Sequence, residues 1–132
     1  MIDHVGFGVT DYARSRAFYE RALAPLGITI VLEPQGQAAG FGRGQKPFFW
    51  IEMHMPKASG SLHVAFLAED RETVHAFHAA ALEAGGTDNG APGPRPIYHP
   101  NYYGAYVLDP DGNNVEAVCH TGPTGAESAP GE

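Results

Sequence analysis

Two stretches of the sequence repeat one pattern: residues 4–27 read HVGFGVTDYARSRAFYERALAPLG, and residues 63–86 read HVAFLAEDRETVHAFHAAALEAGG. A repeat of this length indicates two copies of one structural unit. The residues that the two copies share at equivalent positions are His4 and His63, Val5 and Val64, Phe7 and Phe66, Asp11 and Asp70, Ala17 and Ala76, Phe18 and Phe77, Ala22 and Ala81, Leu23 and Leu82, and Gly27 and Gly86.

Each copy predicts a strand followed by a helix. The apolar runs at 2–9 and 62–68 favour strands, and Asp11 and Asp70 are good N-caps for the helices that follow. Apolar side chains then recur at helical spacing, and Gly27 and the pair at 85–86 end the two helices. The residues expected on the buried helix faces are Ser15, Phe18, Tyr19, Ala22 and Leu26 in the first copy and Val74, Phe77 and Ala81 in the second.

Short strand candidates divided by turn residues follow each helix. The clearest turn is Asp-Pro-Asp-Gly at 109–112, because proline presets φ and glycine accepts a positive φ. Together these segments predict the order βαβββ twice, an α+β fold. The strand candidates are 28–32, 38–42 and 47–54 in the first copy, and 87–98, 103–108 and 113–119 in the second.

The length and composition are those of one globular domain. The chain has 132 residues, of which 43% are hydrophobic and 17% are charged. We expect a single domain over 1–120, with module one at 1–54 and module two at 61–120. The stretch 121–132, rich in Gly, Pro, Ser and Glu, is expected to be a flexible tail.

The net charge narrows the class of partner. A formal charge of −7 with scattered Lys and Arg disfavours nucleic acid and anionic membranes. The first residues lack a basic segment followed by a long apolar run, and no later run approaches the ~18 apolar residues of a membrane helix. We therefore expect a cytoplasmic protein that binds a small-molecule substrate.

Matched polar residues mark a candidate metal site between the halves. His4 and His63 open equivalent strands, while Glu52 and Glu116 lie among apolar residues in the last strand of each half. A buried carboxylate costs several kcal/mol, roughly, unless it is paired, and a pseudo-twofold axis brings equivalent positions together. Two histidines and one or two glutamates suit Zn, Ni, Fe or Mn. The alternative is that each histidine is a core or edge residue and each glutamate faces solvent.

The two strand histidines, the helices after them and the ending YYGAYVLDPDGNNVEAV at 102–118 resemble the vicinal oxygen chelate superfamily. This superfamily includes glyoxalase I, extradiol dioxygenases and the fosfomycin and bleomycin resistance proteins. The resemblance implies two βαβββ modules in pseudo-twofold arrangement, whose curled mixed sheet surrounds one divalent metal ion. It places His4, His63 and Glu116 at the metal-ligand positions, and it implies a homodimer.

Glu52 divides the two enzymatic hypotheses that the resemblance implies. In glyoxalase-like lyase or isomerase chemistry, a metal polarises a carbonyl and stabilises an enediolate while a glutamate moves a proton, so Glu52 is ligand or base. The arginine that contacts glutathione in that family is replaced by Gly8 here. The alternative is an Fe(II) extradiol-type dioxygenase, in which Tyr106 hydrogen-bonds a substrate oxygen. The third hypothesis is a non-catalytic protein that sequesters a small compound, as bleomycin resistance proteins do.

Residues 95–103, RPIYHPNYY, carry many polar and aromatic side chains just before the strand that precedes Glu116. They are expected either to line the mouth of the pocket or to pack on its rim as a surface loop. His99 is a candidate acid or base. The candidate substrate contacts are Asn101, Tyr102 and Tyr103 from this segment, and Phe48 and Trp50 as an apolar wall beside Glu52.

Overall fold

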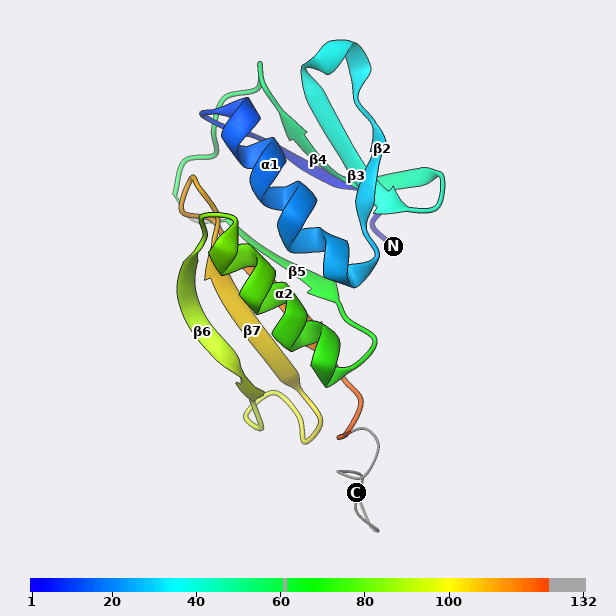
Figure 1. The fold of residues 1–132 in the computed structure, drawn as a ribbon, viewed down its shortest axis with the longest axis vertical. Helices are drawn as coiled ribbons and strands as arrows, with labels where there is room; N and C mark the ends of the chain where they lie inside the picture. The colour runs from blue at the N-terminus through cyan, green and yellow to red at the C-terminus, as the bar shows by residue number, and fades with distance from the viewer. Residues whose placement is uncertain (61, 124–132) are drawn as a thin grey trace.

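The computed structural model describes residues 1–60 and 62–123, and it contains two βαβββ modules (Figure 1). The α+β fold predicted from the repeat is therefore confirmed. Module one contains β1 (Val5–Gly8), α1 (Tyr12–Leu23), the short 3-10 helix η1 (Ala24–Leu26), β2 (Thr29–Leu32), a second 3-10 turn η2 (Pro34–Gly36), β3 (Ala38–Arg43) and β4 (Lys46–Glu52). Module two contains β5 (His63–Leu67), α2 (Arg71–Glu83), β6 (Thr87–Pro94), β7 (Tyr103–Leu108) and β8 (Asn114–Cys119).

Each module builds its own four-stranded mixed sheet, with the same strand order in both. The orders are β1-β4-β3-β2 and β5-β8-β7-β6. The first strand of each module pairs in parallel with the last, and the other pairings are antiparallel. The first strand of each sheet is thus hydrogen-bonded to the strand that carries the candidate glutamate.

The helix boundaries follow the predicted caps. Asp11 accepts a hydrogen bond from the Arg14 backbone N–H at 3.1 Å, and Asp70 accepts one from that of Thr73 at 2.8 Å. Gly27 has a φ of 74° after η1, and Gly85 has a φ of 103° just after α2. All the helix residues predicted to be buried are buried.

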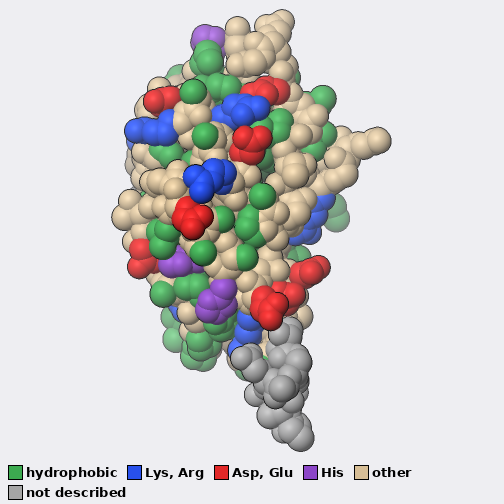
Figure 2. Space-filling model, viewed as in Figure 1, with side chains coloured by type: hydrophobic (Ala, Val, Ile, Leu, Met, Phe, Trp, Pro, Cys, Tyr) green, Lys and Arg blue, Asp and Glu red, His purple; other side chains and the backbone are tan. Residues whose placement is uncertain are grey.

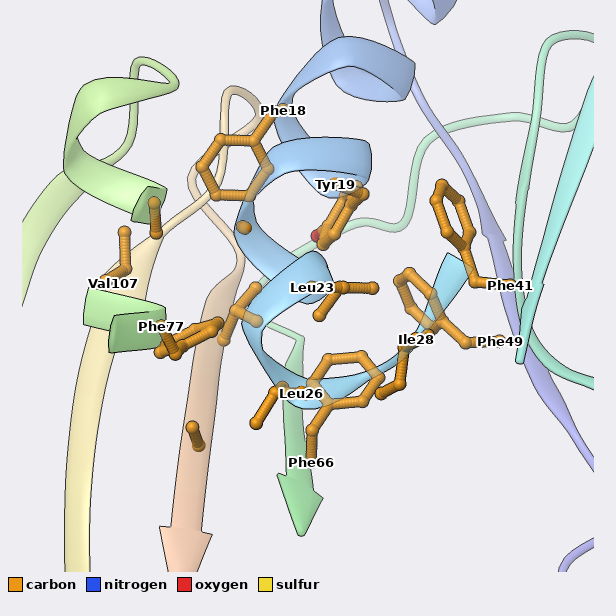
Figure 3. Close-up of a cluster of buried hydrophobic side chains, with 14 of the residues drawn as sticks. Phe18, Tyr19, Leu23, Leu26, Ile28, Phe41, Phe49, Phe66, Phe77 and Val107 are labelled. Atoms are coloured by element: carbon orange, nitrogen blue, oxygen red, sulfur yellow. The ribbon is translucent and has the colours of Figure 1, made fainter. Parts of the chain in front are cut away.

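Aromatic side chains from both modules make one core. Figure 3 shows Phe18, Tyr19 and Leu23 of α1 among side chains from both sheets, including Phe49 and Phe66. The rings of Phe49 and Phe66 meet edge to face with their centroids 5.1 Å apart, which joins β4 to β5. The helices α1 and α2 therefore cover one face of the sheets and leave the other face of each sheet open (Figure 1).

The predicted turn at 109–112 ties module two to α1. Asp109 is buried and accepts hydrogen bonds from the Tyr19 hydroxyl at 2.5 Å and from the Asn113 backbone N–H at 2.8 Å. Asp111 accepts a hydrogen bond from the Thr10 backbone N–H at 3.1 Å. These contacts hold the loop before β8 against the start of α1.

The helix-covered surface carries charges of both signs. Figure 2 shows Lys and Arg side chains interspersed with Asp and Glu over this face, so no single-sign field extends across it. No helix within 1–60 and 62–123 has the length and apolar character that a bilayer crossing requires. Most of the predicted tail, 124–132, lies outside the described residues, and the prediction of a single domain over 1–120 stays a prediction.

Candidate functional site

The open face of the second sheet carries a cluster of polar side chains around Glu116. Side chains alternate between the two faces of a strand, so Val115 and Ala117 turn into the core while Glu116 turns away from α2. Register places Glu116 directly opposite Ala65 on β5 and Tyr106 on β7. The pairing of the first and last strands thus brings the candidate glutamate next to the strand that His63 opens.

Glu116 is a buried carboxylate with two polar partners. Only 1% of its side chain is exposed. Its Oε1 lies 2.8 Å from His63 Nε2, and its Oε2 accepts a hydrogen bond from the Tyr102 hydroxyl. Because an unpaired buried carboxylate is costly, both contacts offset part of its desolvation.

Two tyrosines next to this carboxylate stay protonated. Burial raises the pKa of Tyr102 far above its ordinary value, and the hydrogen bond to Glu116 raises that pKa further. Burial, followed by the charge of Glu116, also raises the pKa of Tyr106. The rings of His63 and Tyr106 have centroids 6.2 Å apart. Both phenols are therefore neutral hydroxyl groups near neutral pH, and the Tyr102 hydroxyl serves Glu116 as a donor.

Module one has a cavity of about 760 Å³ on the open face of its sheet. The side chains of Trp50 and Glu52 line it, and glycines make room for the indole ring. A Cβ added at Gly40 would lie 2.7 Å from atoms of the Trp50 ring, and one at Gly6 would lie 3.0 Å from the Trp50 Cβ. The other polar lining residues include Asp3, His4, Gln35, Gln37, Lys46 and His54.

Glu52 differs from Glu116 in having no side-chain partner among the described residues. It is partly exposed, and in the described part of the chain no side chain hydrogen-bonds or ion-pairs with its carboxylate. Its carboxylate therefore lines the cavity without an ion-pair partner among the described residues.

His4 lies just outside the strand in which the sequence placed it. The expected strand was 2–9, but β1 begins at Val5, which is the first residue paired with β4. The residues before Val5 are not paired with another strand, and the His4 side chain is 59% exposed to solvent. His4 Nδ1 lies 2.7 Å from Asp3, which also pairs with Lys46 Nζ at 2.7 Å. The Lys46 and His4 contacts lower the pKa of Asp3.

The structure separates the predicted ligands into two half-sites within one chain. His63 and Glu116 are in contact, whereas His4 and Glu52 line the cavity of module one, which has no lining residue from module two. Among residues 1–60 and 62–123, no three His, Cys, Asp or Glu side chains converge on a point that could hold a metal ion. The expected single site between the halves of one chain is therefore not assembled. Equivalent residues of the two modules meet only when they lie close to the pseudo-twofold axis, and these two His and Glu pairs do not.

The predicted mouth residues are divided between the two faces of β7 and the loop before it. Tyr102 belongs to the site because its hydroxyl donates to Glu116. The His99 ring contacts the Tyr102 ring, and His99 Nε2 lies 2.5 Å from His120 Nδ1. Asn101 is exposed and donates its backbone N–H to His99. Tyr103 is not brought to the site: its hydroxyl lies 2.7 Å from His75 Nε2 of α2.

Strand alternation explains the position of Tyr103, since Tyr103 and Gly104 must point to opposite faces. Phe48 lies in a smaller groove of about 310 Å³ with His4 and Val64, and it is not among the lining residues of the Trp50 cavity.

Sequence reasoning did not identify the glycines that make room for Trp50 and Glu116. A Cβ at Gly104 would lie 3.1 Å from Glu116 Oε2. Glycines inside predicted strands were the available signal.

Comparison with known proteins identifies the family. The model of the Glyoxalase/Bleomycin resistance protein/Dioxygenase superfamily matches residues 1–117. The chain belongs to this superfamily. Superfamily members generally use a divalent metal ion, typically bind small molecules and form dimers.

Solved structures of the superfamily share the fold. A glyoxalase/bleomycin resistance protein from Albidiferax ferrireducens T118 is 34% identical, with a TM-score of 0.76 over 90% of this chain and 98% of that chain. Lactoylglutathione lyase from Agrobacterium tumefaciens is 22% identical, with a TM-score of 0.65 over 90% and 92% of the two chains. A variant of glyoxalase I from Zea mays is 26% identical, with a TM-score of 0.65 over 89% of this chain and 46% of that chain. No match was found among curated proteins.

Proposed function

We propose that this chain is a divalent-metal-dependent enzyme that acts on a small molecule with adjacent oxygen atoms and carries out lyase or isomerase chemistry. The observation that carries the proposal is the buried Glu116 carboxylate, which faces His63 Nε2 at 2.8 Å on an open sheet face. The carboxylate is buried and the His63 imidazole is half exposed above it, and together they form a nitrogen and oxygen ligand pair.

The residues of one chain supply half of a metal site at each module. Structural and catalytic metal ions usually take at least about three protein ligands, which neither half offers alone. Each half nevertheless offers one histidine and one glutamate. We therefore propose that module one of one copy faces module two of a second copy, so that His4 and Glu52 join His63 and Glu116 of the partner. A homodimer with twofold symmetry would hold two such sites.

The side chains of the proposed site have different roles in the reaction. The metal supplies Lewis-acid polarisation of a substrate carbonyl when it is bound. The Tyr102 hydroxyl donates a hydrogen bond to Glu116 and holds its carboxylate in place. We therefore assign Glu116 to holding the metal rather than to transferring protons. Glu52 has no side-chain partner among the described residues of its own chain. Besides its place beside the metal, we assign to it the transfer of a proton between adjacent carbons of the substrate. Trp50 gives the substrate an apolar surface.

A ring-cleaving dioxygenase is the second candidate, and the position of Tyr106 favours it. Tyr106 lies opposite Glu116 in the strand register and next to the His63 ring, where its neutral hydroxyl could donate to a substrate oxygen. In this case His4, His63 and Glu116 would bind Fe(II), and Glu52 would not be a ligand.

The test is complementation between two inactive variants. The first is His4→Ala/Glu52→Gln, which removes the half-site of module one, and the second is His63→Ala/Glu116→Gln, which removes that of module two. In a mixed dimer, the intact module one of the second variant faces the intact module two of the first. We expect neither variant alone to bind Zn(II) or Ni(II) in a chelator competition assay, and the mixed dimer, isolated with two different tags, to bind one ion per dimer.

A mixed dimer that stays without metal, while the wild-type protein binds it, would place the site within one chain. A wild-type protein that binds none of Zn(II), Ni(II) or Fe(II) would overturn the metal-dependent proposal. The Fe(II)-loaded protein separates the two chemistries: oxygen uptake with a catechol, reduced by Tyr106→Phe and unaffected by Glu52→Gln, would favour the dioxygenase.

A further inference from the structure

A guanidinium group lies beside the polar cluster of the second sheet. Arg95 follows β6, and its Cζ lies 5.3 Å from the centroid of the Tyr106 ring. The His63 ring contacts the same tyrosine, with the centroids 6.2 Å apart. Tyr106 thus contacts both Arg95 and His63.

The backbone around Arg95 is shaped to hold the guanidinium. A Cβ added at Gly93 would lie 3.2 Å from Arg95 Nη1, and one at Gly90 would lie 3.4 Å from Nη2 and 2.8 Å from Tyr106 Cδ1. The register between β6 and β7 also shifts on both sides of Gly90, the glycine that lies next to Arg95 Nη2. Arg95 also donates to the carbonyl oxygens of Ala91 at 2.9 Å and Pro94 at 3.2 Å. The group is therefore fixed over Tyr106.

The charge of Arg95 is not neutralised. The helix arginines Arg16 and Arg21 face Glu33 and Glu83, but within the described residues Arg95 has no carboxylate partner. The two carbonyl contacts leave the other guanidinium N–H donors available, and a planar guanidinium matches a carboxylate with two parallel hydrogen bonds.

We propose that Arg95 binds a carboxylate of the substrate, so that the substrate class is small organic acids whose carboxylate lies several atoms from the adjacent oxygens. The position of the adjacent oxygens, next to His63 and Glu116, rests on the proposed function. The carboxylate subsite itself needs no metal ion. The rings of Tyr98 and Tyr102, with centroids 4.8 Å apart, add an apolar wall next to it.

A carboxylate fits this subsite better than a phosphate. Among the described residues, Arg95 is the one Lys or Arg side chain that contacts the rings of Tyr98, Tyr102 and Tyr106. Phosphate groups are usually held by several cations or by a run of backbone N–H groups, whereas one guanidinium balances one carboxylate.

The test compares a carboxylate with its neutral analogue in metal-free protein. We expect phenylacetate to bind at least about tenfold more tightly than phenylacetamide, which has nearly the same shape, because a charge-assisted pair is lost in the amide. Binding is measured by NMR chemical shift titration. Arg95→Gln should abolish this preference, and Arg95→Lys should keep part of it. Gly93→Ala keeps the charge but displaces the guanidinium, and it should weaken phenylacetate binding severalfold.

The matched control is Arg21→Gln, an exposed helix arginine whose loss should leave the preference unchanged. Equal binding of the two probes to wild-type protein would overturn the subsite. So would a preference that persists in folded Arg95→Gln protein, with folding checked by circular dichroism. Competition by inorganic phosphate at the concentration of phenylacetate would overturn the carboxylate assignment.

Metal titrations separate this inference from the proposed function. Without metal binding, a carboxylate preference that depends on Arg95 supports the subsite while the proposed function fails. With Zn(II) bound, 3,4-dihydroxyphenylacetate should bind more tightly than 4-methylcatechol by the same factor that separates the metal-free probes. Metal binding without any carboxylate preference would leave the proposed function intact and overturn the subsite.

Discussion

At the scale of single residues, the buried Asp109 joins the two modules. The residue is 4% exposed, and its carboxylate accepts hydrogen bonds from Tyr19 and Asn113. Burial raises the pKa of Tyr19 well above its ordinary value, so the phenol remains a donor to Asp109. We expect Asp109→Ala to lower the free energy of unfolding by about 3 kcal/mol, because it leaves several buried donors without an acceptor. Urea denaturation measures the loss.

The neighbouring Asp111→Ala is the control for this substitution. Asp111 also accepts hydrogen bonds across the modules, from Thr10, but it does so in an exposed position where water can replace it. Its loss should cost about 1 kcal/mol or less. Equal losses for the two variants would show that burial of Asp109 does not set the strength of the contact.

At the scale of one element, the N-cap of α2 predicts a pH-dependent contribution. The Thr73 backbone N–H and then the Thr73 hydroxyl lower the pKa of Asp70 below its ordinary value of 3.8. A lowered pKa in the folded state means that the ionised group stabilises the fold above the unfolded pKa, and that this stability is lost as the pH falls through the folded value. We expect Asp70→Ala to cost about 1 kcal/mol at pH 7 and less at about pH 3.

Paired urea titrations at the two pH values measure this difference, with Glu69→Ala as the control. Glu69 precedes the cap, is exposed and makes no cap hydrogen bond, so its loss should have little effect at either pH. A cost for Asp70→Ala that does not change with pH would show that the charge of the carboxylate contributes nothing to the cap.

At the scale of the whole molecule, Gly86 allows module one to pack on module two. A Cβ at this position would lie 2.8 Å from Phe18 of α1 and 2.5 Å from Val107 of β7. We expect Gly86→Ala to cost about 2 kcal/mol through overpacking. In a double-mutant cycle measured by urea denaturation, Phe18→Leu should make Gly86→Ala less costly, because the smaller side chain vacates part of the space.

The control is Gly85→Ala, one residue earlier. Gly85 has a φ of 103° and nothing within 4 Å of an added Cβ, so its substitution should strain only the local backbone. Its cost should not depend on whether residue 18 is phenylalanine or leucine. A cost for Gly86→Ala that is likewise independent of residue 18 would contradict the packing explanation.

The local features of this chain were predictable because each rests on residues close in sequence. Hydrophobic periodicity indicated both helices, Asp11 and Asp70 indicated their first residues, and the Asp-Pro-Asp-Gly segment indicated the turn with its positive φ at Gly112. Strand ends were less accurate. The apolar pattern predicts a strand that includes His4, but pairing with β4 begins only at Val5, because it depends on where β4 runs.

The sequence by itself determined the duplication, the order of elements in each module and the four residues that recur as His and Glu, since these follow from local patterns and their repetition. Only the tertiary structure decided which of those residues meet. Distances between residues far apart in sequence depend on how strands and modules pair. Here the pairing of β5 with β8 joins His63 to Glu116, while His4 and Glu52 line a separate cavity of module one. The position of Arg95 over Tyr106 depends in the same way on the register shift of β6 against β7, which no local pattern reveals.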